Sequence, residues 1–150
     1  MLCGLPLNLL ESEDMLVSVQ DLLGPWKSHK DVTPAVLTNL AALALCIDKL
    51  LMKAREAGIR LKVNKSTGTL IAGKRYGGFR PQDCPEGAPG SAHKVGKAGD
   101  IYDPDNVLDA WCTDEILTEC NLYREHPDKT DGWTHLTIRA PGSKKRTFWP

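Results

Sequence analysis

The chain has 150 residues, of which 41% are apolar, so it is long enough for one domain with a single hydrophobic core. Its 19 basic side chains balance 19 acidic ones, and the formal net charge is zero. A chain without net charge exerts no long-range attraction on nucleic acid or on an anionic membrane, so neither is expected as a partner.

The cysteines and the N-terminal stretch indicate the cellular compartment in which the protein is made. Five cysteines occur in the chain: Cys3, Cys46, Cys84, Cys112 and Cys120. Their odd number and the lack of Cys-x-x-Cys spacing predict neither a disulfide framework nor a four-cysteine zinc site. Residues 1–15 lack the positive region of a signal peptide, and the longest apolar run, residues 40–47, is too short to span a bilayer. We therefore expect cytoplasmic synthesis, reduced thiols and no contact with a membrane.

Residues 33–58 form the clearest predicted helix. Thr33 can cap its first turn, Pro34 can occupy its first position, and Gly58 can end it. Apolar residues recur at helical spacing and predict one buried face: Leu37, Leu40, Ala44, Ile47 and Leu51.

Shorter elements follow this helix. Alternation of apolar residues and the position of turn residues predict strands at 59–63, 69–73, 132–141 and 146–150. A second helix is predicted at residues 107–122, with Asp105 or Asn106 as its cap. The segments between them that are rich in glycine, proline or charge are predicted loops: 81–90 and 124–132.

Residues 87–106 are too polar for a core strand and too rich in glycine for a helix, yet they place His93 close to Asp100. A loop that turns at Gly96 and enters a strand would present both side chains. A hydrogen-bonded turn and a metal site both explain this pattern. A catalytic zinc needs about three protein ligands and one open position.

The third ligand of such a site must come from another part of the chain. His135 is the best candidate, because it lies beside Trp133 in the middle of the alternating strand at 132–141. His126, in a predicted loop, is the next candidate. His29, in an early polar segment, is the least favoured.

Residues 91–100, SAHKVGKAGD, match the pattern Ser-x-His-x-x-Gly-x-Ala-x-Asp at every specified position. A chance match of five fixed residues is on the order of one in a million per starting position. The pattern resembles that of the zinc D-alanyl-D-alanine carboxypeptidases and L-alanyl-D-glutamate endopeptidases, which cut peptidoglycan peptides. GGFRP at 77–81 resembles their Gly-Tyr-Arg-Ser/Thr-Pro segment, and GWTHL at 132–136 resembles their Trp-x-His or Trp-His segment. The likeness covers roughly residues 33–150 and is closest to small phage-type members that end in RTF-x-P.

The resemblance implies a role for each matching residue. His93, Asp100 and His135 would bind zinc. Arg80 would hold a substrate carboxylate or the developing oxyanion, because a guanidinium offers a planar fork of donors. Judged from the residues alone, Arg80 could instead form a surface salt bridge. Ser91 would orient the loop or hydrogen-bond a ligand.

One departure from the family pattern concerns the general base. Members of the family usually place Glu or Asp three residues before the last histidine, where this chain has Gly132. Asp131 is one residue further upstream, and Glu125 lies in the predicted loop. On a regular strand Asp131 would lie roughly 13 Å from His135. Glu125 is therefore preferred as the base, and both carboxylates are kept as candidates.

These features predict one α+β domain over residues 1–150, in which residues 1–32 form an N-terminal extension packed on the rest. The resemblance implies a hedgehog/DD-peptidase-like fold, with an antiparallel sheet that carries the zinc site and helices packed on it. It implies a zinc metallopeptidase of phage or prophage origin that cleaves peptidoglycan peptides after release from the cell or as part of a phage particle. A non-catalytic zinc-binding virion protein is one alternative, and a globular domain without metal is another.

Overall fold

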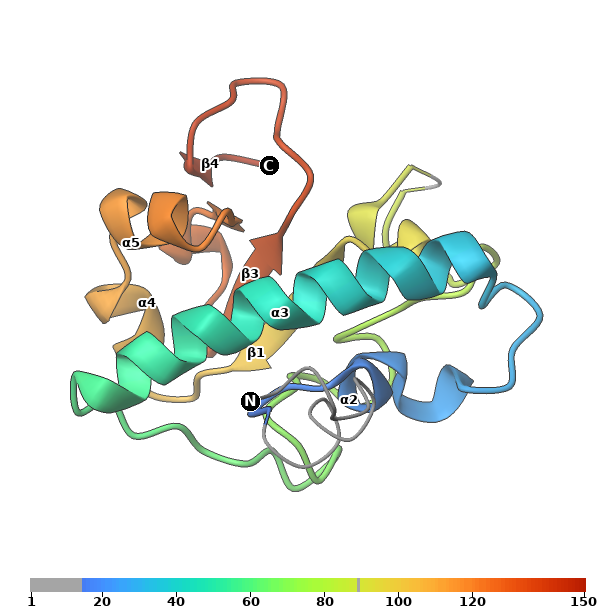
Figure 1. Ribbon diagram of the computed structural model, residues 1–150, viewed down its shortest axis with the longest axis horizontal. Helices are drawn as coiled ribbons and strands as arrows, with labels where there is room; N and C mark the ends of the chain where they lie inside the picture. The colour runs from blue at the N-terminus through green and yellow to red at the C-terminus, as the bar shows by residue number, and fades with distance from the viewer. Residues whose placement is uncertain (1–14, 89) are drawn as a thin grey trace, which may run out of the picture.

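The computed structural model describes residues 15–88 and 90–150 of the chain (Figure 1). The expectation that the chain lacks a signal peptide concerns residues 1–15, almost all of which lie outside the described part. From Met15 onward the N-terminal segment contributes to the same hydrophobic core as the rest of the chain, with Val17, Leu22 and Leu23 buried.

The long helix α3, Pro34–Glu56, confirms the helix predicted at residues 33–58. Thr33 caps it, since its side chain accepts a hydrogen bond from the backbone N–H of Val36 at 3.2 Å. The buried face of the helix is formed by eight residues: Val36, Leu40, Leu43, Ala44, Ile47, Leu50, Leu51 and Ala54. Leu37 is 41% exposed, because the buried stripe begins at Val36 and passes beside it.

α3 also has the length and hydropathy needed to cross a bilayer, which corrects the expectation based on its shorter apolar run. Helices buried in a protein core meet the same two criteria. Here the helix crosses over β1 (Ala98–Tyr102) and β3 (Trp133–Thr137), as Figure 1 shows. Gly99 in β1 lies in this packed layer: a Cβ there would be in ordinary contact with Cδ1 of Ile47 at 3.4 Å, but only 2.8 Å from Cδ2 of Leu22, so Leu22 is the neighbour for which the glycine makes room.

The sheet has four strands in the order β1–β3–β2–β4, where β2 is Tyr123–Glu125 and β4 is Thr147–Phe148. β3 pairs antiparallel with both β1 and β2, whereas β4 pairs parallel with β2. The α+β class is therefore confirmed, but the prediction of a purely antiparallel sheet is wrong. Both edges of β3 are occupied, and the chain that leaves it pairs with the outer edge of β2, where it runs in the direction of β2.

Two other predicted elements differ in the structure. Residues 59–63 and 69–73 form no regular strands. Two isolated bridges occur in this part of the chain, Asn64 to Thr69 and Ile71 to Ile101. The Asn64 side chain holds the turn instead, because its Nδ2 donates to the carbonyls of Ile71 at 3.0 Å and Gly73 at 2.7 Å.

The predicted helix at 107–122 is split into α4, Val107–Trp111, and α5, Asp114–Glu119. The α5 helix has its own cap, Thr113. Asn106, one of the two predicted caps, stands at the N-cap position of α4, but its side chain makes no capping hydrogen bond. The buried carboxylate of Asp103 accepts the N–H groups of the first turn instead, at 3.0 and 3.1 Å.

The cysteines of the described residues agree with the expectation of reduced thiols. Cys46, Cys84, Cys112 and Cys120 are all free, and Cys3 lies outside the described part. Burial raises the pKa of the Cys112 thiol to about 12, so this group stays protonated at neutral pH.

Two adjacent glycines bring the chain from the core toward the sheet. The N-terminal helix α2, Val19–Leu23, ends where the carbonyl of Leu22 accepts the N–H of Phe79 at 2.8 Å. A Cβ at Gly78 would lie 2.0 Å from that carbonyl oxygen, and one at Gly77 would lie 2.1 Å from the carbonyl oxygen of Ala72. Only glycine fits at either position, and the segment then delivers Arg80 to the edge of β1.

We predict that Gly78→Ala lowers the free energy of unfolding by about 2 kcal/mol or more, because the added methyl would overlap backbone atoms that cannot move aside. Gly142→Ala is the matched control, since a Cβ there meets no atom within 4 Å, and it should change stability by less than about 0.5 kcal/mol. Urea denaturation of both variants measures the difference. Equal stability of the two variants would show that the close approach to Leu22 is not maintained in solution.

Candidate metal centre

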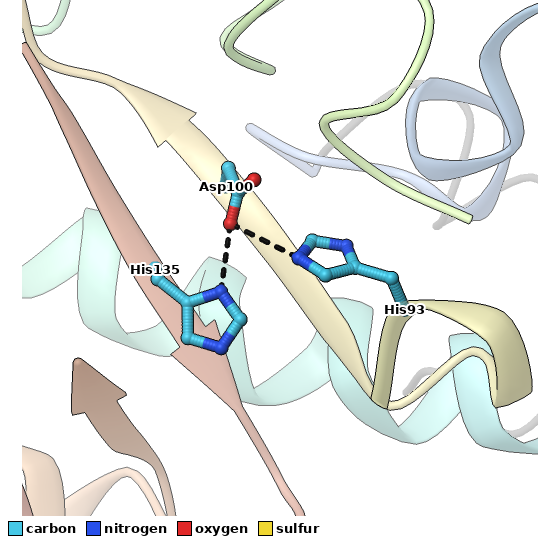
Figure 2. Close-up of side chains that lie close together, drawn as sticks. All are labelled: His93, Asp100 and His135. Atoms are coloured by element: carbon cyan, nitrogen blue, oxygen red, sulfur yellow. Dashed lines mark hydrogen bonds and ion pairs between the residues drawn. The ribbon is translucent and has the colours of Figure 1, made fainter. Parts of the chain in front are cut away.

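Three side chains from separate elements converge on one point (Figure 2). His93 lies on the 3-10 helix η3, Ala92–Val95, and Asp100 lies in the middle of β1. His135 lies in the middle of β3, directly opposite Asp100 in the antiparallel register. Since paired residues of neighbouring strands point to the same face of a sheet, the register alone brings the carboxylate and this imidazole together.

Two hydrogen bonds hold His93 in place. Its backbone N–H donates to Ser91 Oγ at 3.3 Å, and its ring Nδ1 lies 2.8 Å from the carbonyl oxygen of Gly78. Gly96 follows with a φ of +81°, which favours glycine and turns the chain toward β1. A Cβ at Gly96 would also lie 2.9 Å from the carbonyl oxygen of Val36 in α3.

The donor atoms lie close enough together to share one metal ion. His93 Nε2 lies 3.3 Å from Asp100 Oδ1, and His135 Nδ1 lies 2.8 Å from the same oxygen. All three donor atoms lie within 4.8 Å of one another. A tetrahedral zinc ion with bonds of about 2.0–2.1 Å holds its ligand atoms roughly 3.3–3.4 Å apart. The group could therefore hold a metal after small side-chain adjustments.

The hydrogen-bonding pattern also calls for a cation between His93 and Asp100. A carbonyl oxygen can only accept, so Nδ1 of His93 carries its proton toward Gly78 and a neutral ring presents a lone pair at Nε2. That lone pair faces a carboxylate, and both residues are at least 95% buried. A proton or a metal ion on Nε2 removes this repulsion. A ligating histidine with its other nitrogen bonded to a carbonyl is the usual arrangement in metal sites.

The electrostatics of Asp100 favour the charged carboxylate. Burial is the largest single influence and acts to raise the pKa of Asp100, but the adjacent His93 and His135 together outweigh it. The pKa of Asp100 therefore lies well below its usual range. A buried carboxylate that is ionised at neutral pH is a suitable ligand for a divalent cation.

Arg80 completes the surroundings of this carboxylate. Its Nε donates to the carbonyl of Tyr76 at 2.7 Å, and its Nη2 lies 3.5 Å from Asp100 Oδ2. The two oxygens of Asp100 thus have different partners, the imidazoles on Oδ1 and the guanidinium on Oδ2. The Arg80 side chain is only 13% exposed, so its ion pair lies inside the site and is not a surface salt bridge.

The structure separates the two candidate bases. Glu125 is the last residue of β2, next to β3, and not part of a loop as expected from the sequence. It shares a cavity with His135, and burial raises the pKa of its carboxyl, partly offset by the nearby imidazole of His135. Asp131 is exposed, and its Oδ1 accepts a hydrogen bond from Asn106 Nδ2 at 2.8 Å. Asp131 thus serves the turn before α4, and Glu125 is the carboxylate that faces the cluster.

Two cavities flank the cluster. One of about 600 Å³ reaches Arg80 and Asp100, and aromatic side chains, including Tyr102 and Trp133, line it. The other, of about 240 Å³, is lined by residues that include Ser91, Glu125, His135 and Phe148. Both ends of the cluster are therefore accessible to a bound molecule.

The two remaining histidines lie elsewhere. His126 stacks on Trp149, with ring centroids 3.8 Å apart. His29 forms a second group with Asp31 and Asp83, whose donor atoms also lie within 4.8 Å of one another, and sequence reasoning missed this group. Nδ1 of His29 already accepts the N–H of Asp31 at 3.0 Å, and the group is only partly buried. It therefore offers a poorer ligand set than the group around Asp100.

Comparisons of the chain with protein-family models, curated proteins and solved structures found no match. The case for a metal centre therefore rests on the converging donor atoms of His93, Asp100 and His135.

We predict that the protein binds about one zinc ion per chain, and that zinc at 100 times its Kd stabilises the fold by about 2.7 kcal/mol. His93→Ala should abolish both effects, because it removes one of the three ligands. His126→Ala, which removes a histidine outside the cluster, should keep both. Elemental analysis and thermal unfolding with and without zinc measure the two effects. Retention of zinc by His93→Ala, or its loss in His29→Ala instead, would contradict the assignment.

Proposed function

We propose that the chain is a zinc metallopeptidase that cleaves peptide bonds of peptidoglycan and comes from a phage or prophage. The observation that carries the proposal is the convergence of His93, Asp100 and His135 between two cavities, with Arg80 on one side and Glu125 on the other. The match of residues 91–100 to the peptidase pattern supplies the substrate class.

The donor set is the reason for naming zinc. Two imidazole nitrogens and one carboxylate oxygen form a common ligand set for catalytic zinc, with one position left open. None of the free cysteines belongs to the group. When bound, zinc would polarise the scissile carbonyl and make water a stronger acid and hence a better nucleophile at neutral pH.

The protein's own side chains would do the rest. The Glu125 carboxylate would accept a proton from the attacking water and return it to the leaving amine, a role that suits a carboxyl whose pKa burial raises. The Arg80 guanidinium would hold a substrate carboxylate or the developing oxyanion. Ser91 and the carbonyl of Gly78 would keep His93 in the orientation that exposes Nε2.

The partner in this proposal is a peptidoglycan peptide, with no role for nucleic acid or membrane. In this proposal the protein is made in the cytoplasm and would reach the wall after cell lysis or as part of a phage particle. Such routes need no membrane-crossing step by the enzyme itself.

A second function is favoured by one residue. Gly132 occupies the position where the resembling peptidases usually carry a carboxylate, and its N–H donates to Asn106 Oδ1 at 2.8 Å as part of a turn. If Glu125 does not replace that carboxylate, the chain would be a non-catalytic zinc-binding protein, for example a structural component of a virion.

We predict that Glu125→Gln lowers peptidoglycan hydrolysis by about 10²-fold or more without changing the zinc content, because it removes the proton acceptor. Asp131→Asn is the control. Its side chain can still accept the hydrogen bond from Asn106, so activity should stay within about twofold of the parent. The release of new amino groups from purified cell walls measures the rates.

Loss of hydrolysis in Asp131→Asn, with full activity in Glu125→Gln, would identify Asp131 as the base. Loss of zinc in Glu125→Gln would make that residue a ligand. A parent protein that carries zinc and cleaves no cell-wall preparation would favour the non-catalytic alternative.

A further inference from the structure

A second feature of the cleft lies on the side of Arg80. The 600 Å³ cavity is also lined by Lys74 and Arg75, which the proposed chemistry does not use. A neighbouring cavity of about 410 Å³ lies between α2 and the segment that leads to Gly78, and Lys74 and Arg75 line it too. Lys74 and Arg75 therefore line both the cavity beside Asp100 and the neighbouring cavity near α2.

Arg75 is held in place by the N-terminal segment. Its guanidinium carbon lies 4.9 Å from the ring centroid of Trp26, a cation–π contact. Trp26 Nε1 donates to the carbonyl oxygen of Arg75 at 2.9 Å, and the indole stacks on Tyr76 with ring centroids 6.0 Å apart. The carbonyl of Tyr76 in turn accepts the Nε of Arg80. These contacts link Arg75 through Trp26 and Tyr76 to Arg80, and so fix Arg75 relative to the candidate metal centre.

Lys74 and Arg75 form a cationic wall of the two cavities, and no carboxylate of the described residues is paired with either of them. In residues 15–88 and 90–150, neither Lys74 nor Arg75 has a carboxylate oxygen within 4.0 Å. Of the other acids that line the two cavities, Asp21 is engaged at the start of α2, where its side chain accepts the N–H of Ser18 at 3.1 Å. Glu86 and Asp100 are the acids on the larger cavity, and Asp100 is paired with Arg80. The wall therefore presents a net positive charge to a bound molecule.

We propose that Lys74 and Arg75 form a specificity site that selects a peptide with a free carboxylate away from the scissile bond. This inference rests on the proposed function, because it takes the substrate to be a peptide bound beside Asp100. The held guanidinium of Arg75 loses little conformational freedom on binding, and it can bind a carboxylate with two parallel hydrogen bonds. The ammonium of Lys74 adds a second, more flexible charge.

The test uses two synthetic peptidoglycan stem peptides that differ in one group. One peptide carries the free α-carboxylate of its γ-linked D-glutamyl residue, and the other carries a carboxamide there. At low salt the parent should cleave the carboxylate peptide with a kcat/KM about three- to tenfold higher, mainly through KM, the size expected for exposed charge pairs. The same preference should appear in calorimetric binding of both peptides to the zinc-free protein.

Variants assign this preference to the two cations. Lys74→Gln should reduce the ratio between the two peptides, and Lys74→Gln combined with Arg75→Gln should bring it near one. Arg75→Lys keeps the charge but lacks the planar fork of donors, so it should lower the ratio only in part. Lys145→Gln removes the same charge from an exposed residue outside all three cavities and should leave the ratio unchanged.

The outcomes separate this inference from the proposed function. Equal cleavage of both peptides by the parent, or an unchanged ratio in the double variant, would overturn the specificity site while the peptidase remains. Preferred binding of the carboxylate peptide that depends on Lys74 and Arg75, without cleavage of either peptide, would support the site and count against the peptidase.

Discussion

The buried carboxylate of Asp100 is the feature on which the site depends. A carboxylate with so little exposure must be paired with positive charge or with hydrogen-bond donors, and here His93, His135 and Arg80 all approach it. Its two oxygens divide these partners, so one oxygen and two imidazole nitrogens remain directed toward a shared point. A cation at that point would satisfy all three groups together.

The packing around the site serves this arrangement. Gly96 lets α3 approach the turn between His93 and Asp100, and Gly78 lets α2 approach the segment that holds both His93 and Arg80. The long helix and the N-terminal segment are thus part of the support of the candidate metal centre. Because interiors are closely packed, a change of one methyl group at these contacts would be transmitted to the ligands.

The sequence predicted the parts of the structure that local patterns determine. The cap and the apolar repeat defined α3, and alternation placed His135 in a strand, where the register now sets it opposite Asp100. The pairing of β4 with β2, and the position of Glu125 on a strand beside β3, depend on contacts between distant residues that no local pattern encodes. The wall formed by Lys74 and Arg75 was missed for the same reason, since its organiser, Trp26, lies far away in the sequence.

The account is tested most directly by X-ray diffraction from zinc-loaded crystals, with data collected on both sides of the zinc absorption edge. We predict the strongest anomalous peak about 2.0–2.2 Å from one imidazole nitrogen of His93, one of His135 and an oxygen of Asp100. A strongest peak between His29, Asp31 and Asp83, or zinc-loaded crystals without a peak at Asp100, would contradict the account.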